Sequence, residues 1–211
     1  MWEGTKGFVL GKVEHEMWRD ALEMINRHFA LDFDSKRFDH YERYSFFPKL
    51  AASFEMKEIV KNIVHANLGL NHLDCKSVQI ALRFPGSRKV PLHIDGIPSA
   101  ENQVVPGHEI DFEATFGIFL STISNRSAPL VVKPNSHAVI KKFGQERGFH
   151  ILRRGVLPAL PDEEQVIGGP PGTAILFSPY LAHSVPTNET PTIRYALYAR
   201  LFDPSKQRNT P

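Results

Sequence analysis

Hydrophobic residues recur at three- and four-residue intervals in two segments near the start of the chain. The first runs from Glu14 to Phe29, and the second opens at Pro48 and ends near Gly69. This spacing is typical of amphipathic helices, and glycine commonly follows the last helical residue. We therefore expect two helices, each with one apolar face. The apolar residues are Met17, Trp18, Ala21, Leu22, Ile25 and Phe29 in the first, and Met56, Ile59, Val60, Ile63 and Val64 in the second.

Beyond residue 75 the pattern changes to short apolar runs broken by Pro and Gly, which is typical of strands. In the first run, Val78, Ile80, Leu82 and Phe84 alternate with Ser77, Gln79, Ala81 and Arg83. Because successive side chains of a strand point to opposite faces, the apolar face can receive the helices while the polar face lines an interior. The pattern predicts a barrel or jelly roll around a ligand site. The predicted strands cover about 77–84, 115–122, 129–133, 173–178 and 192–202.

The length of 211 residues fits a single domain, with helical support over about 1–75 and a β core over about 76–203. Two connections, about 96–114 and 138–170, are longer than the fold requires. They are either lids over a substrate or surface insertions.

Composition excludes several classes of protein. The net charge is +2 and the basic residues are dispersed, so nucleic-acid binding is not expected. No apolar segment is long enough to span a bilayer, and no export signal is visible. The single cysteine, Cys75, excludes an internal disulfide framework and a four-cysteine zinc site. We expect a cytoplasmic protein without a membrane partner. The oligomeric state stays open.

The triplet His93-Ile94-Asp95 places an imidazole and a carboxylate on one face of an extended segment. With a distant histidine, these side chains could form the facial triad that leaves three iron positions open. A second triplet, His72-Leu73-Asp74, follows a helix exit, where Asp commonly serves turns.

The third ligand has four candidates, His108, His137, His150 and His183. We favour His183 because it follows an apolar run and precedes Arg194, which starts an aromatic-rich run. A guanidinium among apolar residues is costly unless it pairs with an anion such as a carboxylate. The alternative for Arg194 is a surface arginine on an edge strand.

Together these motifs resemble the phytanoyl-CoA dioxygenase-like (PhyH) branch of the iron(II)- and 2-oxoglutarate-dependent oxygenases. His93-Ile94-Asp95 looks like the family's H-x-D, and Pro134-Asn135-Ser136-His137 looks like its P-G-S-H, with Asn135 for Gly. The run from Gly172 through His183, Asn188 and Arg194 is also similar. The resemblance covers about 77–202, but Ser127-Ala128-Pro129 replaces the usual N-G pair, so we expect a different turn there.

This resemblance implies a double-stranded β-helix in which His93, Asp95 and His183 bind Fe(II). Arg194 would bind the far carboxylate of the co-substrate 2-oxoglutarate. With O2, such enzymes hydroxylate a C–H bond of a small-molecule substrate and release succinate and CO2. The related halogenases lack the carboxylate that Asp95 supplies, which argues against halogenation. Desaturation, epoxidation and ring closure stay open.

Other residues have less specific roles. Gln79 is either a further co-substrate contact or a structural glutamine, and Arg83 on the inward face is either a candidate contact for an anionic substrate or a solvated cation. Arg88 and Lys133 are more simply solvated cations, and His137 more simply makes a hydrogen bond in its turn.

Two other functions stay open. One is a protein-modifying oxygenase such as a JmjC-like hydroxylase, although those usually anchor the oxoacid with Lys. The other is a cupin-like binding protein without turnover.

Overall fold

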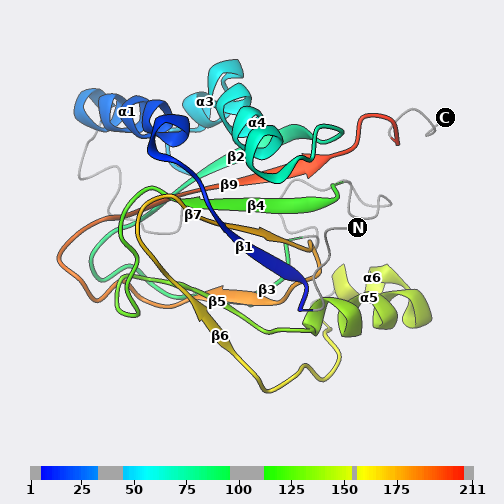
Figure 1. The fold of residues 1–211 in the computed structure, drawn as a ribbon. Helices are drawn as coiled ribbons and strands as arrows, with labels where there is room; N and C mark the ends of the chain where they lie inside the picture. Colours follow the sequence, from blue (N-terminus) through cyan, green and yellow to red (C-terminus); the bar gives the residue numbers. More distant parts are fainter. Residues whose placement is uncertain (1–5, 33–44, 96–111, 154–155, 207–211) are drawn as a thin grey trace.

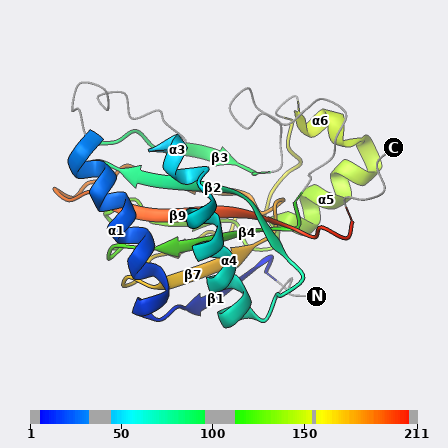
Figure 2. The ribbon, with the colours of Figure 1, turned by 90° about the horizontal axis from the view of Figure 1, so that it is seen from above.

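Two antiparallel sheets lie face to face, with helices covering the outer face of the larger one (Figures 1 and 2). The computed structural model describes residues 6–32, 45–95, 112–153 and 156–206. The larger sheet has the order β1-β7-β4-β9-β2, and the smaller has the order β3-β8-β5-β6. The strands are β1 (Phe8–Lys12), β2 (Asp74–Arg83), β3 (Val90–His93), β4 (Ala114–Phe119), β5 (Leu130–Val132), β6 (Gln165–Ile167), β7 (Thr173–Phe177), β8 (His183–Val185) and β9 (Arg194–Phe202).

The predicted helices are present, with one correction. The first is α1 (His15–Asp32), but the second is divided into α3 (Pro48–Ala51) and α4 (Phe54–Leu68). The break arises because Ser53 is extended and caps α4, its side chain accepting a hydrogen bond from the Met56 amide. Gly69, in the left-handed conformation (φ 64°), ends α4 as predicted.

The largest core cluster fills the space between the helices and the larger sheet, as the sequence predicts. Trp18 and Ile25 of α1 and Val60 of α4 pack there against Ile80 of β2 and Leu197 of β9. The odd-numbered residues of β9 face the helices, so its even-numbered residues face the smaller sheet. Ala196 confirms this orientation, because it belongs to a second cluster between the two sheets, with Phe119, Leu130, Phe177 and Val185.

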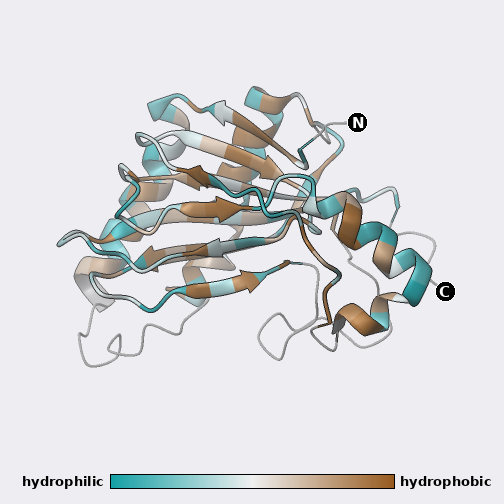
Figure 3. Cartoon of the chain, turned by 90° about the horizontal axis from the view of Figure 1, so that it is seen from below, coloured by the Kyte–Doolittle hydropathy of each residue, from teal (hydrophilic) through white to brown (hydrophobic). Residues whose placement is uncertain are grey.

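Several elements were not predicted. The range 138–170 is not a plain connection, because it contains most of α5 (Ser136–Arg147), the short α6 (Phe149–Arg153) and β6. The range 1–75 is not purely helical, because β1 joins the edge of the larger sheet beside β7. Figure 3 shows the smaller sheet and the α5–α6 pair from below. The expected lid over 96–114 falls largely outside the described residues. No described helix is long and apolar enough to cross a membrane.

The two turns that depart from the family pattern both keep a left-handed residue. Asn135 has a φ of 67°, which confirms that Asn can replace Gly there. Ala128 has a φ of 56° although it carries a Cβ, and it is fully buried. The turn at Ser127 therefore places Ala in a conformation that glycine would adopt more easily.

Candidate metal centre

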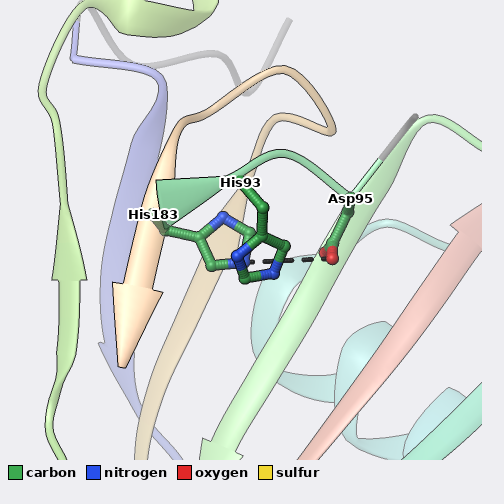
Figure 4. Close-up of side chains that lie close together, drawn as sticks. All are labelled: His93, Asp95 and His183. Carbon is green, nitrogen blue, oxygen red and sulfur yellow. Dashed lines mark ion pairs between the residues drawn. The ribbon is translucent and has the colours of Figure 1, made fainter. Parts of the chain in front are cut away.

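His93 and His183 are neighbours across the smaller sheet. His93 is the last residue of β3 and His183 is the first of β8, and the two residues pair directly in the antiparallel register. Their ring centroids lie 4.3 Å apart. Figure 4 shows the two imidazoles side by side, with Asp95 facing them. The ladder between β3 and β8 therefore brings together two imidazoles that are far apart in sequence.

Both imidazoles present the same nitrogen to the site. Nδ1 of His93 lies 2.8 Å from the carbonyl of Pro91, and Nδ1 of His183 lies 2.9 Å from the carbonyl of Leu181. Because a carbonyl can only accept, each Nδ1 must carry the hydrogen and donate it. Each Nε2 then keeps its lone pair. A hydrogen bond of this kind is the usual way in which proteins orient a histidine ligand.

Asp95 completes the cluster two residues beyond His93. One ligand atom from each of His93, Asp95 and His183 lies within 4.8 Å of the others. Oδ1 of Asp95 is 3.9 Å from Nε2 of His183, and Oδ2 accepts a 2.9 Å hydrogen bond from the Thr115 hydroxyl. Two imidazole nitrogens and one carboxylate oxygen are the donor set of the facial triad.

Burial sets the charge state of His183. Burial and the neighbouring imidazole of His93 lower the pKa of His183 to about 4, although the Asp95 carboxylate opposes the shift. His183 is therefore neutral at pH 7, which is the form that binds a metal ion.

Asp95 is ionised despite its surroundings. Burial by itself would raise the pKa of its carboxyl, but positive charge on His183, Arg200 and His93 and the hydrogen bond from Thr115 together lower it below 3.8. Because His183 is neutral at pH 7, its charge is absent there, and more of the stabilisation then comes from Arg200 and Thr115. The site thus combines a charged carboxylate with a neutral imidazole.

Arg194 lies inside the protein, so the alternative of a surface arginine on an edge strand is wrong. Its strand, β9, runs between β4 and β2, and the residue is 2% exposed. One guanidinium nitrogen donates a 2.8 Å hydrogen bond to the Tyr198 hydroxyl, and Cζ lies 5.7 Å from the ring centroids of Phe119 and Tyr198. Its buried Nε has no hydrogen-bond partner among the described residues. The surroundings therefore leave donor capacity for an anion.

Arg83 lies beside Arg194 rather than apart from it. The two residues are direct partners in the register between β2 and β9, so their side chains leave the same face of the sheet. Burial and the charge of Arg194 lower the pKa of Arg83 to about 10. Arg83 donates one hydrogen bond to the carbonyl of Arg88, while its buried Nε has no partner in the described parts of the chain.

The other candidate histidines are not part of the cluster of described ligands. His137 is the second residue of α5, His150 is exposed in α6, and His108 lies outside the described residues. In the second triplet, Asp74 accepts a hydrogen bond from the Cys75 amide and lies 3.8 Å from the Lys61 ammonium. These contacts give Asp74 a structural role.

Gln79 and Lys133 occupy distinct places. Gln79 pairs with Tyr198 across β2 and β9, on the face that carries Arg194. The Lys133 ammonium donates to the Pro161 carbonyl and lies 3.4 Å from Glu164, so it holds the segment before β6 rather than acting as a freely solvated cation.

Sequence reasoning missed three residues of the site, Thr115, Gly117 and Tyr198, all on the inner face of the larger sheet. A Cβ on Gly117 would lie 2.8 Å from the Tyr198 ring, so this glycine makes room for the ring that meets Arg194. The single polar residue in the apolar run from Ala114 to Phe119 was the available signal for Thr115.

No protein-family model and no curated protein matches the sequence. Solved structures do match nearly the whole chain at low identity. The non-heme alpha ketoglutarate dependent carbocyclase SnoK from nogalamycin biosynthesis is 12% identical with a TM-score of 0.63, over 100% of this chain and 89% of that one. EctD from S. alaskensis, solved with 2-oxoglutarate and 5-hydroxyectoine, is 14% identical with a TM-score of 0.58, over 97% and 74%.

A third neighbour, the non-heme monooxygenase ThoJ, is 16% identical with a TM-score of 0.59, over 96% of this chain and 76% of that one. At such identities the likeness concerns the fold. It confirms the prediction of a mainly β protein with a double-stranded β-helix core, the fold of the non-heme oxygenases.

Proposed function

We propose that this chain is an Fe(II)- and 2-oxoglutarate-dependent dioxygenase, similar to the PhyH branch. It hydroxylates a C–H bond of a small-molecule substrate and releases succinate and CO2. One observation carries the proposal. A two-histidine, one-carboxylate donor set lies in the same interior as a buried arginine whose Nε has no partner among the described residues.

The donors fit ferrous iron. His93 and His183 supply Nε2 atoms whose tautomer is fixed, and Asp95 supplies a charged oxygen. Such a triad leaves open positions for a chelating co-substrate and for O2. When bound, the iron would activate O2 with electrons taken from the oxoacid. The three side chains would hold it where β3 ends and β8 begins.

Arg194 supports the oxoacid as co-substrate. A planar guanidinium suits a carboxylate because two parallel hydrogen bonds can form. The Tyr198 hydroxyl accepts from Arg194 and keeps its own hydrogen available to donate. Arg83, which we considered as a substrate contact, would place a second positive charge beside the same carboxylate. Gln79, opposite Tyr198, is a further contact in this proposal.

The structural neighbours support a small-molecule substrate and more than one outcome. They include a carbocyclase, an epimerase and a protein solved with 5-hydroxyectoine. Hydroxylation is the outcome we propose for this chain, since it needs no residue beyond those that position the substrate. Asp95 occupies the place of the ligand that halogenases lack.

The test is succinate formation from 2-oxoglutarate with Fe(II) under air, across a library of small molecules. We expect at least one compound to raise succinate formation in the wild type and not in Asp95→Ala. His72→Ala and Asp74→Ala are matched controls, because they alter the second H-x-D triplet, and both should behave as wild type. Equal background succinate in wild type and Asp95→Ala across the library would favour a binding protein without turnover. Stimulation by folded proteins alone would favour a protein-modifying oxygenase.

A further inference from the structure

A hydroxyl group is buried against the carboxylate of the candidate metal centre. Thr115 is 1% exposed and lies on β4, where its direct partners are Phe177 on β7 and Arg200 on β9. Its Oγ1 donates a 2.9 Å hydrogen bond to Oδ2 of Asp95. Valine has nearly the same shape and an equal preference for strands. Packing alone therefore does not explain the hydroxyl.

The two oxygens of Asp95 have different surroundings. Oδ2 accepts the hydrogen bond from Thr115, whereas Oδ1 faces the imidazole of His183 at 3.9 Å from Nε2. A carboxylate can bind a metal ion through one oxygen or through both. Binding through both would take two coordination positions, and one fewer would remain for other ligands.

Arg200 adds charge to the same carboxylate. It is the residue opposite Thr115 on β9, its Cζ lies 5.5 Å above the ring of Phe112, and its charge favours the ionised form of Asp95. The charge of a guanidinium acts on the carboxylate as a whole. A hydrogen bond is directional, so the Thr115 hydroxyl distinguishes Oδ1 from Oδ2.

We propose that Thr115 is a positioning residue that holds Asp95 in a one-oxygen binding mode and thereby keeps a coordination position open. This inference rests on the proposed function for the identity of the metal site. In this proposal, a residue outside the triad controls the number of coordination positions that the triad occupies on the metal. Hydrogen bonds that orient metal ligands in this way typically change metal affinity or activity 10- to 100-fold when they are removed.

The test uses Co(II) without turnover. Thr115→Val removes the hydroxyl with little change in shape, and Thr115→Ser keeps the hydroxyl and removes the methyl group. For each protein the Co(II) dissociation constant and the visible d–d spectrum are measured, because the spectrum reports coordination number. Thr115→Ala is a second variant without the hydroxyl, should valine disturb folding. Thermal unfolding of the metal-free proteins shows that each is folded.

We expect Thr115→Val to weaken Co(II) binding about 10- to 100-fold and to alter the spectrum, while Thr115→Ser stays within a few-fold of wild type. Equal affinity and spectrum in wild type and Thr115→Val would overturn the role of Thr115 and leave the proposed function standing. Equal losses in the Val and Ser variants would overturn it too, because the cause would then be packing. Failure of the wild type to bind Co(II) would overturn both.

Discussion

Arg83 and Arg194 face each other directly across β2 and β9, so two buried guanidinium groups are neighbours on one face of the sheet. Among the described residues, the buried Nε of each has no hydrogen-bond partner, and no carboxylate forms an ion pair with either guanidinium. Two buried like charges are unfavourable in the absence of an anion. The arrangement therefore favours an anionic group, such as a carboxylate, between them.

We predict that Arg194→Gln weakens binding of 2-oxoglutarate by about 30-fold or more, because truncation of a buried charged partner costs about 2 kcal/mol or more. Calorimetry on the Mn(II)-loaded protein measures the affinity without turnover. 2-Oxopentanoate, which has a methyl group in place of the far carboxylate, is the control ligand. Its affinity should change little in the variant. An equal loss for both ligands would show that Arg194 acts on the fold and not on the carboxylate.

Arg83→Met should stabilise the ligand-free protein. Burial and the charge of Arg194 disfavour the charged form of Arg83, as its lowered pKa of about 10 indicates, and methionine keeps much of the apolar stem. We expect a gain of about 1 kcal/mol, which corresponds to about 2–4 °C in Tm for a chain of this size. The stabilisation that added 2-oxoglutarate gives to the metal-loaded protein should shrink in the same variant. A lower Tm without ligand would contradict this account.

Gly117→Ala should weaken the binding of 2-oxoglutarate, although it replaces neither arginine. The new Cβ would lie 2.8 Å from the Tyr198 ring, so the ring must shift and the hydrogen bond from Arg194 must change. We expect the dissociation constant for 2-oxoglutarate to rise about tenfold, because Arg194 would lose part of the hydrogen bond that positions it, and a hydrogen bond to a charged group is worth about 1.5–3 kcal/mol. Gly11→Ala is the matched control, because nothing lies within 4 Å of its Cβ. Unchanged affinity in Gly117→Ala would show that Tyr198 has no role in binding 2-oxoglutarate.

The metal-free protein should lose stability as the pH falls through the range from about 6.5 to 4. Burial lowers the pKa of His183 from 6.5 to about 4, so in this range the unfolded chain binds a proton at His183 that the folded chain does not. Stability then rises with pH across the range and is fully present above about 6.5. The lowered pKa of Asp95 affects the pH dependence of stability only below the ordinary pKa of 3.8, which is outside this range. Denaturant unfolding of wild type and His183→Gln in the presence of a chelator isolates the effect. Parallel pH profiles for the two proteins would contradict it.

Much of this fold could be predicted because the hydrophobic pattern indicates the helices and the face of the sheet that they cover. The stripe of α1 and α4 and the alternation along β2 identify the helix-covered face, and the aromatic residues around Arg194 indicate a buried arginine. Other elements have no such signal. β1 is an edge strand whose Val9 and Leu10 are exposed, and β6 has three residues. Only Ser136, Ile140 and Gly144 of α5 are buried, so its periodicity is weak.

The three residues of the candidate metal cluster were predictable from the sequence, whereas the residues that surround them were not. His93, Asp95 and His183 follow from the spacing of motifs, and the described structure brings all three together. Thr115, Gly117 and Tyr198 depend on the register of the larger sheet, because β4 and β9 pair Thr115 with Arg200 and Gly117 with Tyr198. Pairing of distant strands is a property of the folded sheet, and a single sequence does not encode it locally.

The most direct test of the central claim is an anaerobic titration of the protein with Fe(II) and 2-oxoglutarate, followed by visible absorption. Chelation of the metal by the oxoacid should give a charge-transfer band only when both are present. We predict that the wild type and His72→Ala show this band, that Asp95→Ala lacks it, and that Arg194→Gln needs a higher oxoacid concentration to reach it. Absence of the band in the wild type, or an equal band in Asp95→Ala, would contradict the account.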